Sequence, residues 1–416
     1  MERHPRVVLF ALAALAVVAC TSGQGVASPA PATTPAEWPA ASPAASPPQE
    51  RAPTPTPRPT AESTPATDRL QVSTVGWKTD FSRHSVPLDE IVPGGPPKDG
   101  IPPIDAPRFV SFAEADQWLA DQEPVIAFEL ESVARAYPLQ IMIWHEIVND
   151  EVNGRPVLIT FCPLCNLALA FDRHVEGVGT LRFGTTGNLR HSDLVMWDDA
   201  TESWWQQAMG EAIVGELTGT RLQPLPAAIV SYAGFKAGFP HGQVLSRETG
   251  YRRPYGQNPY VGYDEVGQRP FLFREPIDGR LPPMMRVVVV VLDGETVVYP
   301  FTELEQRRVI ADEIGGQPFV VFWEFGAVSA LDQLDIASSR MIGSTGVFVP
   351  VVDGRHLTFS VSDGRIRDRE TGSIWNVLGQ ATDGPLAGQR LEPIVHGDYF
   401  WFAVAPFYPE ARIWHP

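Results

Sequence analysis

The chain has 416 residues, of which 44% are hydrophobic, so it is long enough to bury a sizeable core and to form more than one domain. Its 49 acidic side chains outnumber 32 basic ones, and the formal charge of −17 is opposite to that of a phosphate-binding surface. We therefore expect no nucleic-acid partner.

The first 19 residues have the form of a bacterial export signal. Arg3 and Arg6 precede an apolar run, 7–19, that is too short to span a bilayer. The letters VVAC resemble a lipobox, in which the cysteine is lipidated and becomes the mature N-terminus. We expect 1–19 to be a lipoprotein signal peptide and Cys20 the lipid anchor, which places the protein outside the cytoplasm on the cell membrane or the outer membrane. The alternative is an ordinary cleaved signal with a chance cysteine.

Residues 20–68 consist largely of Pro, Ala, Thr and Ser. Such a segment has too few large apolar side chains to offset the entropy lost on ordering. Its prolines favour extended polyproline II conformations, so we expect a disordered, semi-stiff tether.

The remaining chain contains an internal repeat. Residues 126–165 align without gaps on the stretch that begins at Val288, and residues 201–225 align on 371–394. The repeat predicts two homologous modules in tandem, a first segment at 104–246 and a second segment at 284–416, joined by a connector at 247–283. We expect the matched segments to superpose, with Tyr137 on Tyr299 and Trp205 on Trp375.

Dipeptides that favour positive φ angles mark the expected hairpins. Asn153-Gly154 and Gly315-Gly316 occupy the same place in the two segments, and Asp293-Gly294 has Glu131-Ser132 opposite it. The stretch PLQIMIWHEI, at 138–147, has apolar residues at helical spacing and predicts one short helix per module. Further strands are expected in LALAFDR and TLRFGTT. The predicted fold class is mainly β with short helices.

Cys162 and Cys165 form a CxxC pair at the end of a predicted strand. Because Cys20 is assigned to lipid, these two cysteines have only each other as partners within the chain. A strand, not a helix, is expected after Cys165, so a β-turn bearing two thiols is favoured over a thioredoxin fold. The second segment has Glu324 and Ala327 in these places, which favours a site specific to the first segment over a purely structural disulfide.

Two thiolates with an imidazole are a common ligand set for Zn²⁺ or Cu(I). His145, on the helix before the hairpin that leads to Cys162, is the leading third ligand. Weaker candidates are His174, His191, Asp193, Met196 and Met209. Two alternatives stay open: a redox-active dithiol, and a permanent Cys162–Cys165 disulfide in a non-catalytic envelope binding or structural protein. A cysteine hydrolase is disfavoured because no third catalytic partner or oxyanion element is identifiable.

Three blocks carry a family resemblance: AYPLQIMIWHEIVNDEVNGRPVLITFCPLCNLALAFDR, SDLVMWDDATESWWQQAMGEAIVGELTGTRL and LSRETGYRRPYGQNPYVGYD. Together they resemble the bacterial family catalogued as domain of unknown function 3179, over nearly the whole globular region. The resemblance implies no established activity. The sequence therefore predicts a membrane-tethered lipoprotein whose first module carries a CxxC site for copper or zinc, or for dithiol chemistry, with no protein partner identified.

Overall fold

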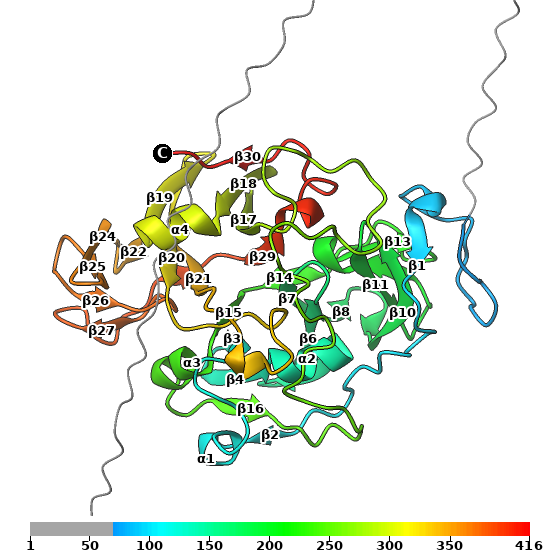
Figure 1. Ribbon diagram of the computed structural model, residues 1–416, viewed down its shortest axis with the longest axis horizontal. Helices are drawn as coiled ribbons and strands as arrows, with labels where there is room; N and C mark the ends of the chain where they lie inside the picture. Colours follow the sequence, from blue (N-terminus) through cyan, green and yellow to red (C-terminus); the bar gives the residue numbers. More distant parts are fainter. Residues whose placement is uncertain (1–69) are drawn as a thin grey trace, which may run out of the picture. The chain divides into compact units, whose positions relative to one another are not determined.

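The computed structural model describes residues 70–416, and its fold is mainly β with short helices, as predicted (Figure 1). The expected signal peptide, Cys20 and the whole of the expected tether (20–68) lie outside the described residues. Among residues 70–416, no helix has the length and apolar character needed to cross a membrane.

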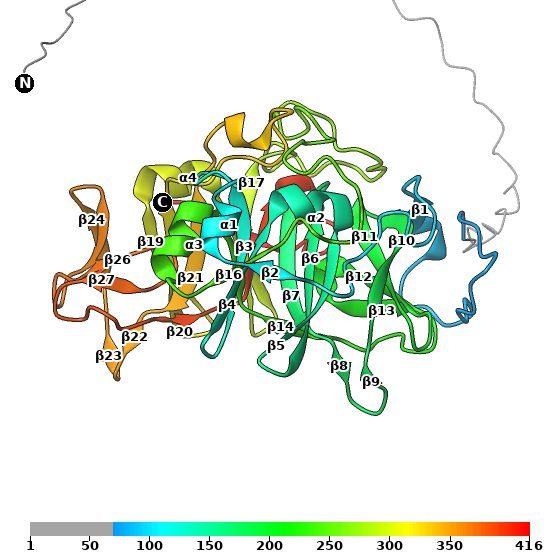
Figure 2. The same cartoon turned by 90° about the horizontal axis from the view of Figure 1, so that it is seen from below.

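Three sheets contain the main strands of the first segment, and the third of them also includes β1, which precedes that segment. The first has the order β15-β3-β4-β16-β2, with β2 (Phe109–Val110), β3 (Pro124–Leu130), β4 (Val133–Pro138), β15 (Ala227–Ser231) and β16 (Gln243–Leu245). The second has the order β14-β7-β6-β5, with β5 (Ile147–Val152), β6 (Arg155–Cys162), β7 (Leu167–Asp172) and β14 (Gln223–Leu225). The third has the order β1-β10-β11-β12-β13, with β1 (Ile91–Pro93), β10 (Phe183–Arg190), β11 (Asp193–Asp198), β12 (Trp204–Gln206) and β13 (Glu211–Val214). A small hairpin, β8 (His174–Val175) with β9 (Gly179–Thr180), projects from this part of the fold (Figure 2).

The second segment contains three sheets of similar connectivity. The first has the order β29-β17-β18-β30, with β17 (Arg286–Leu292), β18 (Glu295–Pro300), β29 (His396–Phe400) and β30 (Arg412–Ile413). The second has the order β19-β20-β21-β28, with β19 (Val309–Ile314), β20 (Gln317–Glu324), β21 (Ser344–Val349) and β28 (Glu392–Pro393). The third has the order β24-β25-β26-β27, with β24 (Phe359–Ser362), β25 (Arg365–Asp368), β26 (Ile374–Trp375) and β27 (Ala381–Asp383). A two-stranded hairpin is formed by β22 (Val351–Val352) and β23 (Arg355–His356).

The helices are short. The α-helices are α1 (Phe112–Ala115), α2 (Leu139–His145), α3 (Tyr232–Gly238) and α4 (Phe301–Arg307), and the 3₁₀ helices are η1 (Leu88–Glu90), η2 (Gln207–Met209), η3 (Ile336–Ser338) and η4 (Trp401–Ala403). Helices α2 and α4 occupy the places where the repeat predicts one helix per module. In both helices, a proline with φ near −60° immediately precedes the first helical residue. Proline suits this position because its ring fixes φ at a value that is compatible with entry into a helix.

All four predicted two-residue turns are confirmed. The strand pairs Val152↔Arg155 and Ile314↔Gln317 close directly around Asn153-Gly154 and Gly315-Gly316. The central residues of these two turns, Asn153, Gly154, Gly315 and Gly316, all have a positive φ, between 52° and 82°. Positive φ at both central positions matches the right-handed twist of the flanking strands, which is why the turn chemistry fixes the register.

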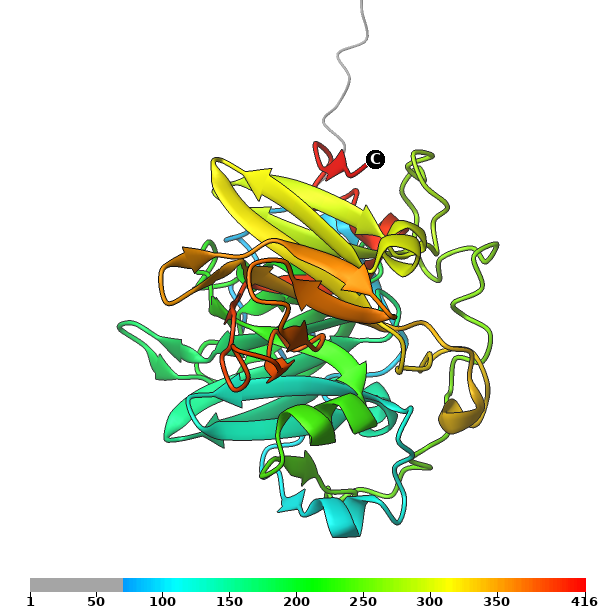
Figure 3. The ribbon, with the colours of Figure 1, turned by 90° about the vertical axis from the view of Figure 1, so that its left-hand side faces the viewer.

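The two segments share their hydrophobic core. Val125, Ala127 and Val230 of the first segment belong to the same buried cluster as Val320 and Phe348 of the second. Figure 3 shows β17 to β20 (yellow) and β3 to β6 (cyan and teal) as separate layers, with the strands around β21 (orange) between them. The segments are therefore packed against one another through this shared cluster, while a further buried cluster, which includes Val288 and Trp323, lies wholly within the second segment.

Candidate functional site

The two cysteines lie on the tight turn that joins β6 to β7. The backbone N–H of Cys165 donates to the carbonyl of Cys162 at 3.2 Å, and that of Asn166 donates to the carbonyl of Pro163 at 3.2 Å. Asn166 has a φ of 58°, which completes the reversal before β7 begins at Leu167. The predicted β-turn is confirmed, and a strand follows it where a thioredoxin-like site has a helix.

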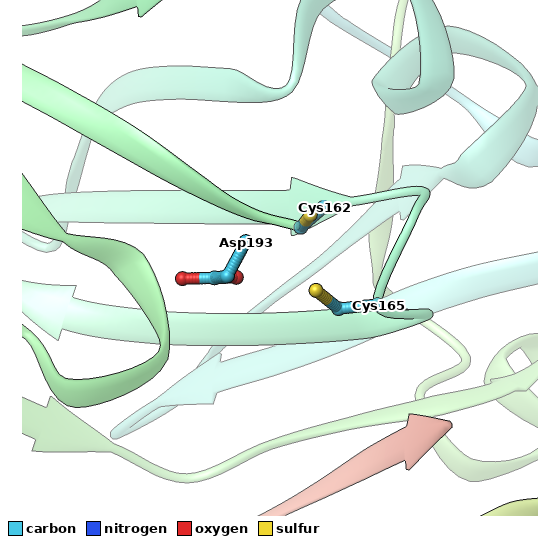
Figure 4. Close-up of side chains that lie close together, drawn as sticks. All are labelled: Cys162, Cys165 and Asp193. Atoms are coloured by element: carbon cyan, nitrogen blue, oxygen red, sulfur yellow. The ribbon is translucent and has the colours of Figure 1, made fainter. Parts of the chain in front are cut away.

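A third acidic group lies beside the two sulfurs. Cys162, Cys165 and Asp193 each offer one ligand atom, and these atoms all lie within 4.8 Å of one another (Figure 4). Both cysteines are free thiols, and all three side chains are buried. Among residues 70–416, no other group of three or more Cys, His, Asp or Glu side chains is this compact.

Asp193 is brought to the sulfurs by the turn between β10 and β11. The two residues of that turn, His191 and Ser192, have φ angles of 55° and 63°. The same turn presents the carbonyl of Ser192 to the thiols, which donate to it at 3.5 Å from Cys165 and 3.8 Å from Cys162. A local backbone reversal thus supplies both a carboxylate and a carbonyl to the site.

The carboxylate of Asp193 is only half satisfied by hydrogen bonds. Its Oδ2 accepts from Gln206 Nε2 at 2.5 Å and from the backbone N–H of Ala208 at 2.9 Å. Its Oδ1 is buried and has no hydrogen-bond partner among the described residues. Burial raises the pKa of Asp193 to about 6, although these two hydrogen bonds oppose the shift.

The thiols lie in surroundings that disfavour negative charge. Burial raises the pKa of Cys162 and raises that of Cys165 well above its ordinary value, and the carboxylate of Asp193 adds to both shifts. No lysine, arginine or histidine in residues 70–416 forms an ion pair with Asp193. Since reactive cysteines have lowered pKa values, this environment does not activate either sulfur as a nucleophile.

His145, the expected third ligand, is not one of the three clustered groups. Its side chain is fully buried, with Nδ1 at 2.7 Å from the carbonyl of Pro102 and Nε2 at 2.7 Å from Tyr255 Oη. Burial lowers the pKa of His145 to about 4, so the ring is neutral at ordinary pH. Both ring nitrogens are engaged away from the sulfurs, and the side chain ties the connector to α2.

The weaker candidates lie in different environments. Asp193 joins the cysteines, as described above. His191 places Nδ1 at 2.6 Å from Glu275 Oε1, and Met196 is buried in β11 opposite Trp205. His174 is exposed in β8, and Met209 is in η2. Neither histidine belongs to the compact group of Cys162, Cys165 and Asp193.

The connector covers the site. Besides the contact with His145, Tyr263 Oη donates to the carbonyl of Leu164 at 3.1 Å, and Ser192 Oγ donates to the carbonyl of Phe271 at 2.6 Å. The loops of the connector and α2 lie at the same end of strands β5 to β7 (Figure 2). From the second segment, the backbone N–H of Phe400 donates to the carbonyl of Cys165 at 2.9 Å. The site is therefore enclosed by the connector and the second segment, not by the first segment alone.

Glu146 is a candidate residue that the sequence reasoning did not single out. It follows α2 directly, is 7% exposed, and burial raises its pKa to about 8, with a further contribution from Asp193. The signal was present in the WHEIVND block, where an acidic residue stands between the end of the helix and a buried strand.

Comparison with known proteins gives a family without an activity. The family model described as "Protein of unknown function (DUF3179)" matches residues 98–411, which is most of the chain. No curated protein and no solved structure matches the chain.

Proposed function

Because this chain belongs to the DUF3179 family of proteins of unknown function, we propose its function from the site itself: the protein binds a zinc or copper ion through Cys162, Cys165 and Asp193. The observation that carries the proposal is a buried group of three acidic donors within 4.8 Å, one of whose carboxylate oxygens has no hydrogen-bond partner among the described residues. Thiolate sulfur suits both Zn²⁺ and Cu(I).

The charge of the site supports this proposal. Burying an anionic group without a compensating charge is costly, and a protein ordinarily supplies a basic side chain or a metal ion. Here the described residues supply no basic ion-pair partner to Asp193. A bound cation favours the deprotonated forms of all three groups, so metal binding and loss of their protons occur together.

Dithiol chemistry is the second candidate, favoured by the position of both thiols on one four-residue turn. The raised pKa values and the enclosure of the sulfurs oppose exchange with an external thiol, because exchange needs an accessible thiolate. A permanent disulfide, with an envelope binding or structural role, is the corresponding non-catalytic alternative.

We propose that the protein acts outside the cytoplasm, tethered by lipid on Cys20, as the sequence of the export signal and lipobox indicates. We also propose that the two segments are copies of one module. Supporting this, Trp205 Nε1 donates to Asp198 Oδ2 at 2.9 Å, and Trp375 Nε1 donates to Asp368 Oδ2 at 2.9 Å. Only the first copy has the cysteines.

The test is an anaerobic titration of the reduced full chain with Zn²⁺ and Cu(I). We expect one ion per chain, and we expect the double variant Cys162→Ser/Cys165→Ser to lose binding. Asp368→Asn, which changes a buried aspartate of the second segment that accepts from Trp375 Nε1, is the control and should bind like the wild type. Identical titrations of wild type and double variant would remove the metal proposal. In that event a disulfide resistant to mild reductants would support the structural alternative, and a readily reduced one would support dithiol chemistry.

A further inference from the structure

A cleft with a volume of about 590 Å³ lies where the two segments and the connector meet. It is lined by 116–120 of the first segment, 255–257 of the connector and 334–335 of the second segment, together with Glu123 and Arg247. None of the three metal ligands proposed above lines it. We propose that this cleft binds an apolar zwitterion, an amino acid or a short peptide, whose carboxylate accepts a hydrogen bond from the guanidinium of Arg247. This binding is independent of the metal site.

Hydrogen bonds hold the three parts of the chain together around the cleft. Gln122 Nε2 donates to the carbonyl of Ala337 at 2.9 Å, which joins the first segment to η3 of the second. The backbone N–H of Ile336 donates to the carbonyl of Gly256 at 3.0 Å, which joins η3 to the connector. Small-molecule sites are common at such junctions, where separate parts of the chain supply groups to one ligand.

The wall of the cleft fixes the guanidinium of Arg247. Its Nε donates to Gln140 Oε1 at 2.9 Å, and its Nη2 donates to the same oxygen and to the carbonyls of Trp118 at 3.2 Å and Tyr255 at 3.4 Å. The guanidinium carbon lies 4.7 Å from the ring centroid of Trp118. Gln140 is itself fixed, because it is 1% exposed and its Nε2 donates to Glu123 Oε2 at 2.7 Å.

The remaining nitrogen of this guanidinium is free to bind a ligand. Within residues 70–416, Arg247 Nη1 has no hydrogen-bond partner, and Arg247 forms no ion pair with a carboxylate. Nη1 is not among the unpartnered atoms that the protein encloses, and the half-buried side chain lines the cleft. A carboxylate in the cleft would therefore gain a charge-assisted hydrogen bond from a group that is already oriented.

Acidic side chains restrict what this arginine can bind. Asp116, Glu123 and Asp335 line the same cleft. Asp116 and Glu123 have partners within the protein, whereas Asp335 is exposed and forms no ion pair among the described residues. A ligand with negative charge alone would be repelled by these acids. A zwitterion can instead direct its ammonium group to Asp335 while its carboxylate binds Arg247.

Apolar surface completes the cleft. Trp118, Leu119 and Leu334 line it together with the charged groups, so a bound molecule meets both kinds of surface. An amino acid or a short peptide with an apolar side chain offers a carboxylate, an ammonium group and apolar surface in one molecule. The volume of the cleft also lies within the range of about 300–1,000 Å³ that small-molecule sites have.

The test is isothermal titration calorimetry of the full chain with L-phenylalanine and with the dipeptide alanyl-phenylalanine. We expect at least one of them to bind with a Kd of about 1 mM or lower, and the tighter of the two identifies the source of the zwitterion. Each probe is compared with its N-acetylated form, which lacks the ammonium group, and with its C-terminal amide, which lacks the carboxylate. Both modified forms should bind more weakly, the amide by about tenfold or more.

Three variants locate the two charges of the ligand. Arg247→Gln should weaken binding by about tenfold or more, because it removes a charge-assisted hydrogen bond. Arg269→Gln is the matched control: it removes the same charge from an exposed arginine of the connector that does not line the cleft, and it should bind like the wild type. Asp335→Asn changes an exposed side chain and should weaken binding by about two- to fivefold, with no effect on the N-acetylated probe.

Wild-type protein that binds neither zwitterion at concentrations up to about 10 mM would overturn the proposal. Equal affinities of wild type and folded Arg247→Gln would overturn it as well. If Arg247→Gln did not fold, the decision would rest on Asp335→Asn and on the two modified forms of the probe. Affinities unchanged in all of these comparisons would overturn the proposal.

Discussion

Asp193 has two oxygens in different surroundings, and this division predicts the effect of replacing it. In Asp193→Asn the amide oxygen can keep the hydrogen bonds from Gln206 and Ala208, while the amide nitrogen takes the place of the unpartnered Oδ1 and cannot bind a metal ion. We expect metal affinity to fall by about tenfold or more, with the stability of the metal-free protein changed by about 1 kcal/mol or less. Zinc titration and urea unfolding measure the two effects. Wild-type affinity in this variant would exclude Asp193 as a ligand.

Asp398 in β29 predicts a pH dependence of stability that is independent of the metal. Burial raises its pKa to about 7, although Thr345 and Arg286 oppose the shift. The folded pKa lies above the unfolded one, so the stabilisation is complete below about pH 4 and is lost as the pH rises through 7. Between pH 4 and 8 the wild type should lose about 4 kcal/mol at most relative to Asp398→Asn. Urea unfolding of both proteins at pH 5 and pH 8 measures this difference. If the free energy of unfolding changed by the same amount in the two proteins between these pH values, the prediction would be contradicted.

The candidate site could be predicted only in part at the residue scale. The CxxC pair and its turn follow from local sequence, because Pro163 and a following strand are local signals. Asp193 was a weaker candidate than His145 because its direction depends on two consecutive positive φ angles at His191 and Ser192, which neither residue type requires. Helical spacing placed His145 correctly on α2 but could not show that its nitrogens contact Pro102 and Tyr255.

At the scale of elements, the hairpins were predictable because a two-residue turn specifies both register and side-chain direction. Strand β1 and the residues before it were not predicted. Ile91 pairs with Arg190, and Trp77 packs against Trp204 at a ring-centroid distance of 5.1 Å. These contacts join positions 99 and 127 residues apart in the chain, and nothing in the local pattern of residues 70–93 indicates which sheet they meet.

Two glycines lie at matching places in the two segments, and we expect their replacement to reduce the free energy of unfolding by equal amounts. Gly210 has a φ of 59°, and a Cβ there would lie 2.6 Å from Phe171 Cε1; Gly379 has a φ of 70°, and a Cβ there would lie 2.5 Å from Phe348 Cε1. We expect Gly210→Ala and Gly379→Ala each to reduce the free energy of unfolding by roughly 2–4 kcal/mol, from backbone strain and overpacking together.

The control for this pair is Gly154→Ala, where φ is 76° and a Cβ meets nothing within 4 Å. We expect that variant to reduce the free energy of unfolding by about 1 kcal/mol, the effect of backbone strain alone. Thermal unfolding of the three variants separates the two terms. If Gly210→Ala cost no more than Gly154→Ala, the close approach to Phe171 would not be a packing constraint.

At the scale of the whole molecule, the repeat in the sequence predicted two segments but not how they pack. The strands of each segment have apolar residues facing more than one neighbour, so the pattern does not tell which face meets the other segment. In the structure the second segment reaches the cysteine turn: Phe400 binds the carbonyl of Cys165, and Asn166 Nδ2 donates to the carbonyl of Asp398 at 3.3 Å. The segment without cysteines therefore helps to fix the site in the other.

We propose that the molecule is anchored through Cys20, which lies outside the described residues. Replacing Cys20 with Ala should release the protein from the membrane or block its processing, because the short apolar run cannot hold the chain after cleavage. Membrane fractionation with detection of the processed chain checks this outcome. A processed Cys20→Ala protein that stays on the membrane would show that the lipobox interpretation is wrong.

The most direct test of a metal site at Cys162, Cys165 and Asp193 is the metal content and thiol state of the protein recovered from its own compartment. Purification without chelators, followed by elemental analysis and thiol alkylation before and after metal removal, gives both quantities in one preparation. We predict one zinc or copper ion per chain, with both thiols reacting only after the metal is removed and the chain unfolded. Metal-free protein with a Cys162–Cys165 disulfide would contradict the account.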